Sequence, residues 1–336
     1  MKKIIIDTLG GDSFDNIMQG TVMAAQVNPD IGFILIGERG RIWPHLMAGA
    51  ITSRCEIIEC VESISNDEPP TVVKNRSNSS IHIGLKMLKE GCDHTKEHEY
   101  IAFISAGSTG AVLAGAVLMI GRIPGVLRPA LCPLLPSPDP KKRTMIIDVG
   151  ANMDCKPEYL LGFAKMGSVY MKSIGVKNPR IGLVNVGTED KKGNELTTAT
   201  FALLKESDLN FVGNMEANDA FTGKFDVIVC DGFVGNILLK GAEGAFKLLG
   251  TKLRETLTSS FKAKIGAVLV KKKFENMRKE LGADTVGGSI FIGTKKPVVK
   301  AHGSSSPFAF YNAILTGINA GRSDLTKLLE KEFAEK

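Results

Sequence analysis

Six short turns in the sequence combine glycine with side chains that bind anions or move protons. Each turn contains Asp, Asn, Ser, Thr or His beside glycine, and each follows a short apolar run. The turns are residues 7–12, 105–111, 148–152, 185–190, 231–236 and 302–305. Any one of them is explained as a chain reversal or helix cap, where Gly, Asp and Ser are common. Six are more than chain reversal requires, so together they indicate a binding site.

Two of these turns have the composition of an anion site. In residues 105–111, small residues allow backbone N–H groups and the hydroxyls of Ser108 and Thr109 to face one point at the start of an apolar helix. The positive end of a helix dipole favours an anion at that point. Residues 302–306 have the same character. We therefore expect a ligand of phosphate size here, with plain helix capping as the alternative.

Two other turns offer groups for charge stabilisation. A lysine at position 191 or 192 would neutralise a phosphate or a developing oxyanion, and Asn194 would donate a hydrogen bond. A solvated loop is the alternative for the lysine pair. Asp231 and Asn236 bracket a Gly-Phe-Val-Gly segment, where helix capping is the simplest role.

The turns must be positioned by the apolar runs that precede them. Nine short runs rich in Ile and Val are predicted strands: residues 4–7, 33–37, 56–60, 101–105, 145–149, 181–186, 211–213, 227–230 and 298–301. Continuous apolar runs are typical of strands covered on both faces, as in a mostly parallel sheet with helices on each side. In such sheets ligands bind at the carboxyl ends of the strands, so we expect the turns to share one edge. The whole chain, 1–336, is expected to form a single large α/β domain of three layers.

Several common site motifs are absent from the sequence. No dinucleotide-binding G-x-G-x-x-G, P-loop, G-x-S-x-G elbow or C-x-x-C is present, so no cofactor is predicted. Cys92, His94 and His98 are loosely spaced in a polar loop, and no metal is assigned to them. Aromatic residues make up 6% of the chain, which disfavours nucleic-acid binding by stacking. Reduced core thiols and the absence of a signal or membrane-spanning segment lead us to expect a cytosolic protein.

Residues 244–281 are predicted to form a helical excursion from the sheet. Apolar residues recur there every four positions, at Leu249, Leu253, Leu257, Phe261, Ile265 and Leu269. Because a period of four drifts around a straight helix, the stripe is expected to extend over two helices. Residues 262–281 hold seven basic and two acidic side chains, and so supply +5 of the net charge of +6.

The basic cluster has three possible interpretations. It is a docking surface for an acidic carrier protein, a contact with anionic lipid, or a solvated face. We favour dimerisation for the stripe and membrane or carrier contact for the lysines. The lysines concerned are Lys262, Lys264, Lys271, Lys272 and Lys273.

The chain resembles the bacterial phosphate acyltransferases. The matching stretches occur in order over nearly the whole chain: residues 7–12, 105–111, 122–125, 148–152, 154–157, 166–170, 187–196, 231–236 and 300–305. Ser108 and Leu9 depart from the pattern, because the family usually has Asn and Met there. The resemblance implies a fold similar to phosphotransacetylases and the isopropylmalate dehydrogenase group, without the cofactor of the latter.

The resemblance also implies the reaction. The family transfers a fatty acyl group from acyl-[acyl-carrier-protein] to inorganic phosphate, giving acyl phosphate for phospholipid synthesis. Phosphate is already anionic near neutral pH, so no serine or cysteine nucleophile is required. Predicted catalytic residues are Lys192, Lys191, Asn236 and His302, the last to protonate the leaving thiolate or only to cap its own turn. Predicted phosphate- and substrate-binding residues are Asp7, Gly10, Gly11, Asp12, Ser105, Gly107, Ser108, Thr109, Gly110, Asp148, Asn152, Asn194, Asp231, Ser304 and Ser305.

The resemblance also implies a homodimer that is cytosolic yet associates with the inner face of the cell membrane. There family members deliver acyl phosphate to a membrane-bound glycerol-3-phosphate acyltransferase. On sequence alone, two other classes of function stay open. One is a phosphotransacetylase in the strict sense, which uses coenzyme A thioesters. The other is a non-catalytic protein that docks at the membrane and recruits the carrier protein.

Overall fold

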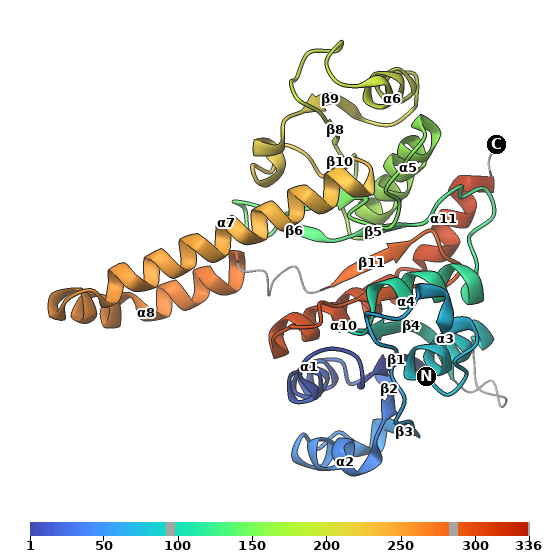
Figure 1. Ribbon diagram of the computed structural model, residues 1–336, viewed down its shortest axis with the longest axis vertical. Coiled ribbons are helices and arrows are strands. Elements are labelled where there is room, and N and C mark those ends of the chain that lie inside the picture. The colour runs from blue at the N-terminus through green and yellow to red at the C-terminus, as the bar shows by residue number, and fades with distance from the viewer. Residues whose placement is uncertain (92–97, 282–287, 335–336) are drawn as a thin grey trace.

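The computed structural model describes residues 1–91, 98–281 and 288–334, with backbone alone at 275, 276 and 278–281. Its strands form two sheets, which lie one above the other in Figure 1. Seven of the ten strand pairings are parallel, and helices cover both faces of each sheet. The predicted fold class, a mostly parallel three-layer α/β architecture, is therefore confirmed. Cys92 and His94 lie outside the described residues.

The first sheet has seven strands. Their order is β3 (Cys55–Glu59), β2 (Ile31–Gly37), β1 (Lys2–Asp7), β4 (Glu99–Ser105), β12 (Val298–Lys300), β11 (Ser289–Ile292) and β5 (Ala130–Cys132). The first five run parallel, and β11 is antiparallel to both of its neighbours.

The second sheet has five strands, in the order β6 (Leu134–Pro136), β7 (Arg143–Ile147), β10 (Val227–Val229), β8 (Ile181–Val184) and β9 (Phe211–Met215). Only Pro133 separates β5 from β6, so the chain passes directly from one sheet to the other. All nine predicted strands are present. The structure differs from the expected single edge, because the six turns are shared between two sheets.

The helices alternate with the strands along the chain. They are α1 (Phe14–Val27), α2 (Arg39–Ala48), α3 (Ser80–Glu90), α4 (Thr109–Gly115), α5 (Pro157–Ser173), α6 (Glu195–Lys205), α7 (Gly232–Thr258), α8 (Phe261–Leu281), α10 (Pro307–Arg322) and α11 (Leu325–Ala334). Shorter helical segments are η1 (Thr52–Arg54), η2 (Pro70–Lys74), the π-helical η3 (Ala116–Ile120) and η4 (Ala217–Phe221).

Successive residues of the buried strands face different layers of the core. In β1, Ile4 and Ile6 join the apolar cluster beneath α1 and α10, whereas Ile5 joins the cluster beneath α3 and α4. Since side chains alternate across a strand, a strand packed on both faces needs apolar residues at consecutive positions. This explains the continuous apolar runs in the sequence.

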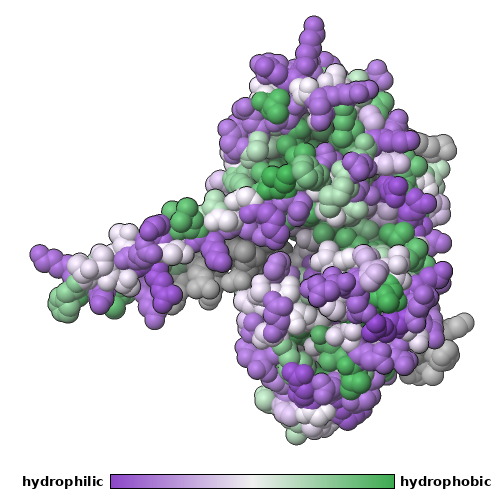
Figure 2. Space-filling model, in the orientation of Figure 1, coloured by the Kyte–Doolittle hydropathy of each residue, from purple (hydrophilic) through white to green (hydrophobic). Residues whose placement is uncertain are grey.

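Helices α7 and α8 form a hairpin that projects from the body (Figure 1). The predicted helical region is present and begins earlier than expected, at Gly232. The apolar stripe is divided between the two helices, which are separated at Ser259 and Ser260. Figure 2 shows apolar residues interspersed with polar ones along this hairpin. None of the described helices is apolar over a length sufficient to cross a bilayer.

Candidate active site

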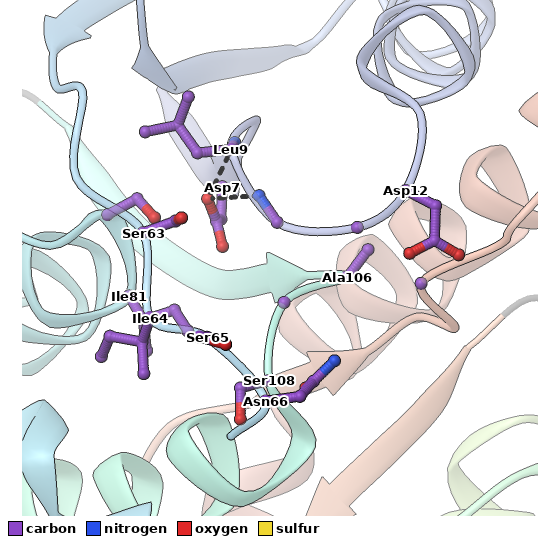
Figure 3. A pocket seen from close by; sticks show the side chains of 15 residues that line it. Asp7, Leu9, Asp12, Ser63, Ile64, Ser65, Asn66, Ile81, Ala106 and Ser108 are labelled. Carbon is purple, nitrogen blue, oxygen red and sulfur yellow. Dashed lines mark hydrogen bonds between the residues drawn. The ribbon is translucent and has the colours of Figure 1, made fainter. Parts of the chain in front are cut away.

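A polar pocket lies where three neighbouring parallel strands, β1, β4 and β12, end. The turns that follow these strands, residues 7–12, 105–111 and 302–305, are called here the first-sheet turns. All three contribute to the lining of a pocket of about 310 Å³ (Figure 3). The structure therefore brings half of the six predicted turns to one place.

Asp7 holds two of the turns that line this pocket in place by hydrogen bonds. Its Oδ1 accepts hydrogen bonds from the backbone N–H groups of Leu9 (3.0 Å) and Gly10 (3.1 Å), and its Oδ2 accepts one from the Ser105 hydroxyl (2.7 Å). Ser105 Oγ in turn accepts from Gly107 N at 3.0 Å. Burial raises the pKa of Asp7, while the hydrogen bond from Ser105 acts in the opposite direction. Asp7 and Ser105 thus fix the relative position of two turns.

The glycines of the first turn are required by close packing. A Cβ at Gly10 would lie 2.7 Å from Asp7 Oδ2 and would also collide with the backbone of Gly107. Gly11 has a φ of +94°, and a Cβ there would lie 2.9 Å from Ala106 Cβ. Only glycine lets the two turns approach so closely.

Ser108 serves as a helix cap and also lines the pocket. Its Oγ accepts from Ala111 N at 3.5 Å, at the start of α4. Thr109 and Gly110 lie behind it, and a Cβ at Gly110 would lie 2.8 Å from Pro70. Neither of these two residues is part of the described pocket lining, so the structure brings only Ser108 of the three to the pocket wall.

The turn after β12 is held by its own side chains. His302 Nδ1 accepts from Ser304 N at 3.2 Å and lies 2.9 Å from Ser304 Oγ. This is the turn-capping alternative for His302. Gly303 O accepts from Asp12 N at 2.8 Å, which joins this turn to the first. Ser305 Oγ is buried without a hydrogen-bond partner among the described residues.

The other three turns follow β7, β10 and β8, which are neighbours in the second sheet. We call residues 148–152, 185–194 and 231–236 the second-sheet turns. Asp148 orders the second-sheet turns by hydrogen bonds, as Asp7 orders the first-sheet turns. Its carboxylate accepts from the backbone of Leu131 (2.8 Å) and Asn152 (2.7 Å) and from the Asn152 side chain (3.0 Å). Burial raises the pKa of Asp148.

Asp231 and Asn236 lie at the start of α7. Asp231 caps the helix by accepting from Val234 N at 2.8 Å, as the simplest interpretation of the sequence predicted. Gly232 N donates to Asn152 O at 2.8 Å and joins two of the second-sheet turns. Asn236 is half-buried and lies next to Gly150, which belongs to the other of these two turns. Its side-chain amide has no hydrogen-bond partner among the described residues.

Lys191, Lys192 and Asn194 are exposed in the loop before α6. Lys192 Nζ is 3.9 Å from a carboxylate oxygen of Glu189. Asn194 forms a capping box with Thr197, in which its side-chain oxygen accepts from Thr197 N at 2.9 Å. The loop is ordered by a hydrogen bond from Asn185 Nδ2 to Lys192 O (2.9 Å). Transition-state contacts by these residues stay predictions.

Exposed apolar side chains accompany the second-sheet turns. Val186 is 80% exposed, Phe233 is 59% exposed and Met153 is 50% exposed, and they follow β8, β10 and β7 respectively. Large apolar residues exposed together beside polar turns usually mark a binding surface. The second-sheet turns therefore combine hydrogen-bonding groups with an apolar surface.

Sequence reasoning missed two parts of this region. Ser63, Ser65 and Asn66 line the pocket from the loop that follows β3 (Figure 3). Their signal was a polar Ser-Ile-Ser-Asn segment directly after a predicted strand. Lys300, the last residue of β12, is also near the pocket and is only 8% exposed. A lysine at the end of an apolar run, just before the His302 turn, was the available signal.

Burial makes three cysteines near Asp148 poor nucleophiles. Burial raises the pKa of Cys155 to about 12, and it also raises the pKa values of Cys132 and Cys230 well above the ordinary thiol value. These thiols stay protonated near neutral pH and are poor nucleophiles. Residues 1–91, 98–281 and 288–334 contain no group of three or more His, Cys, Asp or Glu side chains arranged to hold a metal ion.

Comparison with known proteins identifies similar chains and folds. The family model described as "Fatty acid synthesis protein" matches residues 2–328. The phosphate acyltransferases of Clostridium acetobutylicum and Bacillus licheniformis are each 44% identical to this chain, with 99% of both chains covered. The crystal structure of a phosphotransacetylase from Streptococcus pyogenes has a TM-score of 0.60 at 18% identity, covering 96% of this chain and 94% of that one. The last similarity concerns the fold alone.

Proposed function

Since the chain belongs to the phosphate acyltransferase family and is an acyltransferase that uses phosphate, we propose that its donor is a fatty acyl-[acyl-carrier-protein] and its product a fatty acyl phosphate. The product would enter phospholipid synthesis. In this reaction a phosphate oxygen attacks the thioester carbonyl carbon. A C–O bond forms, the C–S bond breaks, and the phosphopantetheine thiolate leaves and takes up a proton.

One observation carries the proposal: the polar pocket among the first-sheet turns. Its size of about 310 Å³, its hydroxyl groups and its position at the carboxyl ends of parallel strands suit a small oxyanion. An enzyme that uses phosphate as nucleophile has to hold it beside the thioester and stabilise the tetrahedral oxyanion. We assign phosphate to this pocket, near Ser108 and the 302–305 turn.

The second-sheet turns would then hold the thioester. Asn236 and Lys192, or Lys191, are the proposed donors to the oxyanion, and His302 is the proposed proton donor to the thiolate. The exposed apolar side chains of Met153, Val186 and Phe233 support a long acyl chain, because its methylene groups need apolar surface beside the reacting carbonyl. The two sets of turns would thus bind the two substrates.

The projecting hairpin supports the proposed partners. Leu253 and Leu257 of the stripe are half-buried, whereas Leu249, Phe261, Ile265 and Leu269 stay exposed. We propose that these exposed residues pair with a second copy of the chain. The exposed lysines of α8 would contact anionic lipid at the inner face of the membrane or the acidic carrier protein. A cytoplasmic enzyme placed there could pass acyl phosphate to a membrane glycerol-3-phosphate acyltransferase.

The test mixes the purified protein with palmitoyl-[acyl-carrier-protein] and inorganic phosphate, and traps acyl phosphate as the hydroxamate. Hydroxamate that requires phosphate supports the proposal. Formation from palmitoyl-coenzyme A with none from the carrier-bound group would instead establish a strict phosphotransacetylase. No product from either donor would contradict the proposed reaction.

The same assay tests the lysine pair. Replacing Lys191 and Lys192 by Met removes the proposed oxyanion charge, so turnover should fall by more than about tenfold. Lys205→Met is the matched control, because Lys205 is exposed and bonded to Asp190 of the same loop at 3.0 Å. A loss below tenfold, or an equal loss in the control, would remove the pair from the mechanism.

A further inference from the structure

The proposed phosphate pocket contains an unfavourable charge. Asp7 and Asp12 are both among its lining residues. None of the fifteen described residues that line it is Lys, Arg or His (Figure 3). Two carboxylates would repel a phosphate dianion, and an anion held in a partly enclosed pocket needs a compensating positive charge. A cation behind the pocket wall would supply that charge.

Lys300 lies directly behind this wall. It is the last residue of β12 and pairs in register with Ser105 of β4, so its side chain is close to the turn after β4. Its Nζ donates to Ala106 O at 3.3 Å and to Ala301 O. Ala106 is itself part of the pocket lining. The ammonium group is therefore separated from the pocket by a single layer of residues, to which Ala106 belongs.

These two hydrogen bonds also orient the backbone of the site. Ala106 and Ala301 are the residues that open the turns after β4 and β12. In a trans peptide unit the C=O and the following N–H point in opposite directions. By holding both carbonyl oxygens, Lys300 directs the N–H groups of Gly107 and His302 away from itself. Gly107 N then reaches Ser105 Oγ at 3.0 Å, within the hydrogen-bond network of Asp7.

We propose that Lys300 is a positioning residue for phosphate: its buried ammonium group offsets the charges of Asp7 and Asp12 and fixes the turns that carry the lining residues Gly107 and Gly303. This inference rests on the proposed function, because it assumes that phosphate occupies the pocket. It adds a cation to a site whose lining residues supply none.

The charged groups around Lys300 make its contribution depend on pH. Burial lowers its pKa to about 8, Asp7 and Asp12 oppose this decrease, and Lys240 of α7 adds to it. Lys300 therefore loses its proton as pH rises through about 8. Phosphate affinity should then fall over the same range, since the compensating charge is lost.

Kinetics of Lys300→Met and Lys300→Arg, with phosphate varied at saturating acyl donor, test the proposal. In Lys300→Met the KM for phosphate should rise by at least about tenfold, while the KM for the acyl donor stays within about twofold. The wild-type KM for phosphate should rise above pH 8. Lys300→Arg should lack this alkaline rise, because an arginine stays protonated.

Lys3→Met is the matched control. Lys3 is another buried lysine of the same sheet, 9% exposed, and bonds to Glu56 at 3.2 Å, away from the pocket. Its loss should leave both KM values within about twofold of wild type. Equal shifts in Lys300→Met and Lys3→Met, or an unchanged KM for phosphate in Lys300→Met, would overturn the assignment.

A binding measurement separates this inference from the proposed reaction. Inorganic phosphate alone should raise the melting temperature of wild type and Lys3→Met, and should leave that of Lys300→Met unchanged. If wild type turns over no acyl donor, the proposed function fails, and the phosphate-dependent shift still decides the role of Lys300. If Lys300→Met does not fold, the pH profile of Lys300→Arg decides it, and an alkaline rise retained in that variant refutes the proposal.

Discussion

Two buried aspartates, Asp7 and Asp148, occupy corresponding positions at the carboxyl ends of β1 and β7. Each accepts backbone N–H groups from the turn that follows it, and burial raises the pKa of each. Burying a carboxylate costs free energy unless it is well hydrogen-bonded, and several N–H donors offset that cost. Both residues were predicted as binding groups, and the structure shows them building the turns that present other groups.

The hydrogen bonds of Asp148 predict the effect of replacing it. Every hydrogen-bond partner of its carboxylate among the described residues is a donor, so the NH2 group in Asp148→Asn would face at least one N–H of Leu131, Ala151 or Asn152. We expect a loss of about 1–3 kcal/mol in the free energy of unfolding, measured by urea denaturation. Asp231→Asn, which keeps a good helix cap, should lose only a few tenths. Equal losses would contradict this explanation.

At the scale of elements, strands packed on both faces were the most predictable. Ile4, Ile5 and Ile6 form a continuous apolar run because each face of β1 is covered. The short strands β5 and β6 were not predicted, since they lie in a proline-rich segment, and the pairing of β5 depends on distant residues such as Ile292. For the same reason sequence alone did not show that the turns belong to two sheets.

The site was predictable to a similar degree. The pattern of Gly, Asp and Ser at strand ends predicted the three turns that line the pocket, and the binding roles of both sets of turns stay predictions. The pocket contribution of Ser63 and Asn66 was not visible, because β3 is at the sheet edge and its following loop returns to the centre only in three dimensions. Lys300 was hidden because its role depends on the burial of its side chain against Ala106.

The α7–α8 hairpin carries a cluster of exposed basic residues. Three consecutive exposed lysines, at 271, 272 and 273, lie on α8. Each basic residue near an anionic membrane contributes about 1 kcal/mol, so reversing all three should reduce binding by more than about a hundredfold. Flotation of Lys271/Lys272/Lys273→Glu with anionic liposomes measures this effect.

The matched control for this prediction changes the same amount of charge elsewhere. Lys141, Lys172 and Lys177 are exposed and lie outside α7 and α8. Their replacement by Glu should leave flotation close to that of wild type. Unchanged binding of the α8 variant, or an equal decrease in the control, would reject a lipid contact by the hairpin lysines.

At the scale of the whole molecule, α7 connects the two sets of turns. It begins at Asp231 in the second-sheet turns, and Lys240 nine residues later is close enough to Lys300 to lower its pKa. Nine residues of helix span about 13 Å, so the first part of α7 runs from the second-sheet turns toward Lys300, behind the first-sheet pocket. The same helix then continues into the projecting hairpin, which couples the position of the site to the proposed partner surface (Figure 1).

The exposed stripe on that hairpin predicts a dimer. Leu249 is 64% exposed and Leu269 is 81% exposed, which is unfavourable for apolar side chains on a helix that projects into water. In a twofold interface each residue is buried twice, and each buried copy contributes about 1.5–3 kcal/mol. Light scattering should therefore give twice the chain mass of 36.1 kDa for wild type and the chain mass itself for Leu249→Asp/Leu269→Asp. Val27→Asp changes an exposed apolar residue of α1 and should stay dimeric. A dimer that survives both hairpin substitutions would show that copies of the chain associate through another surface.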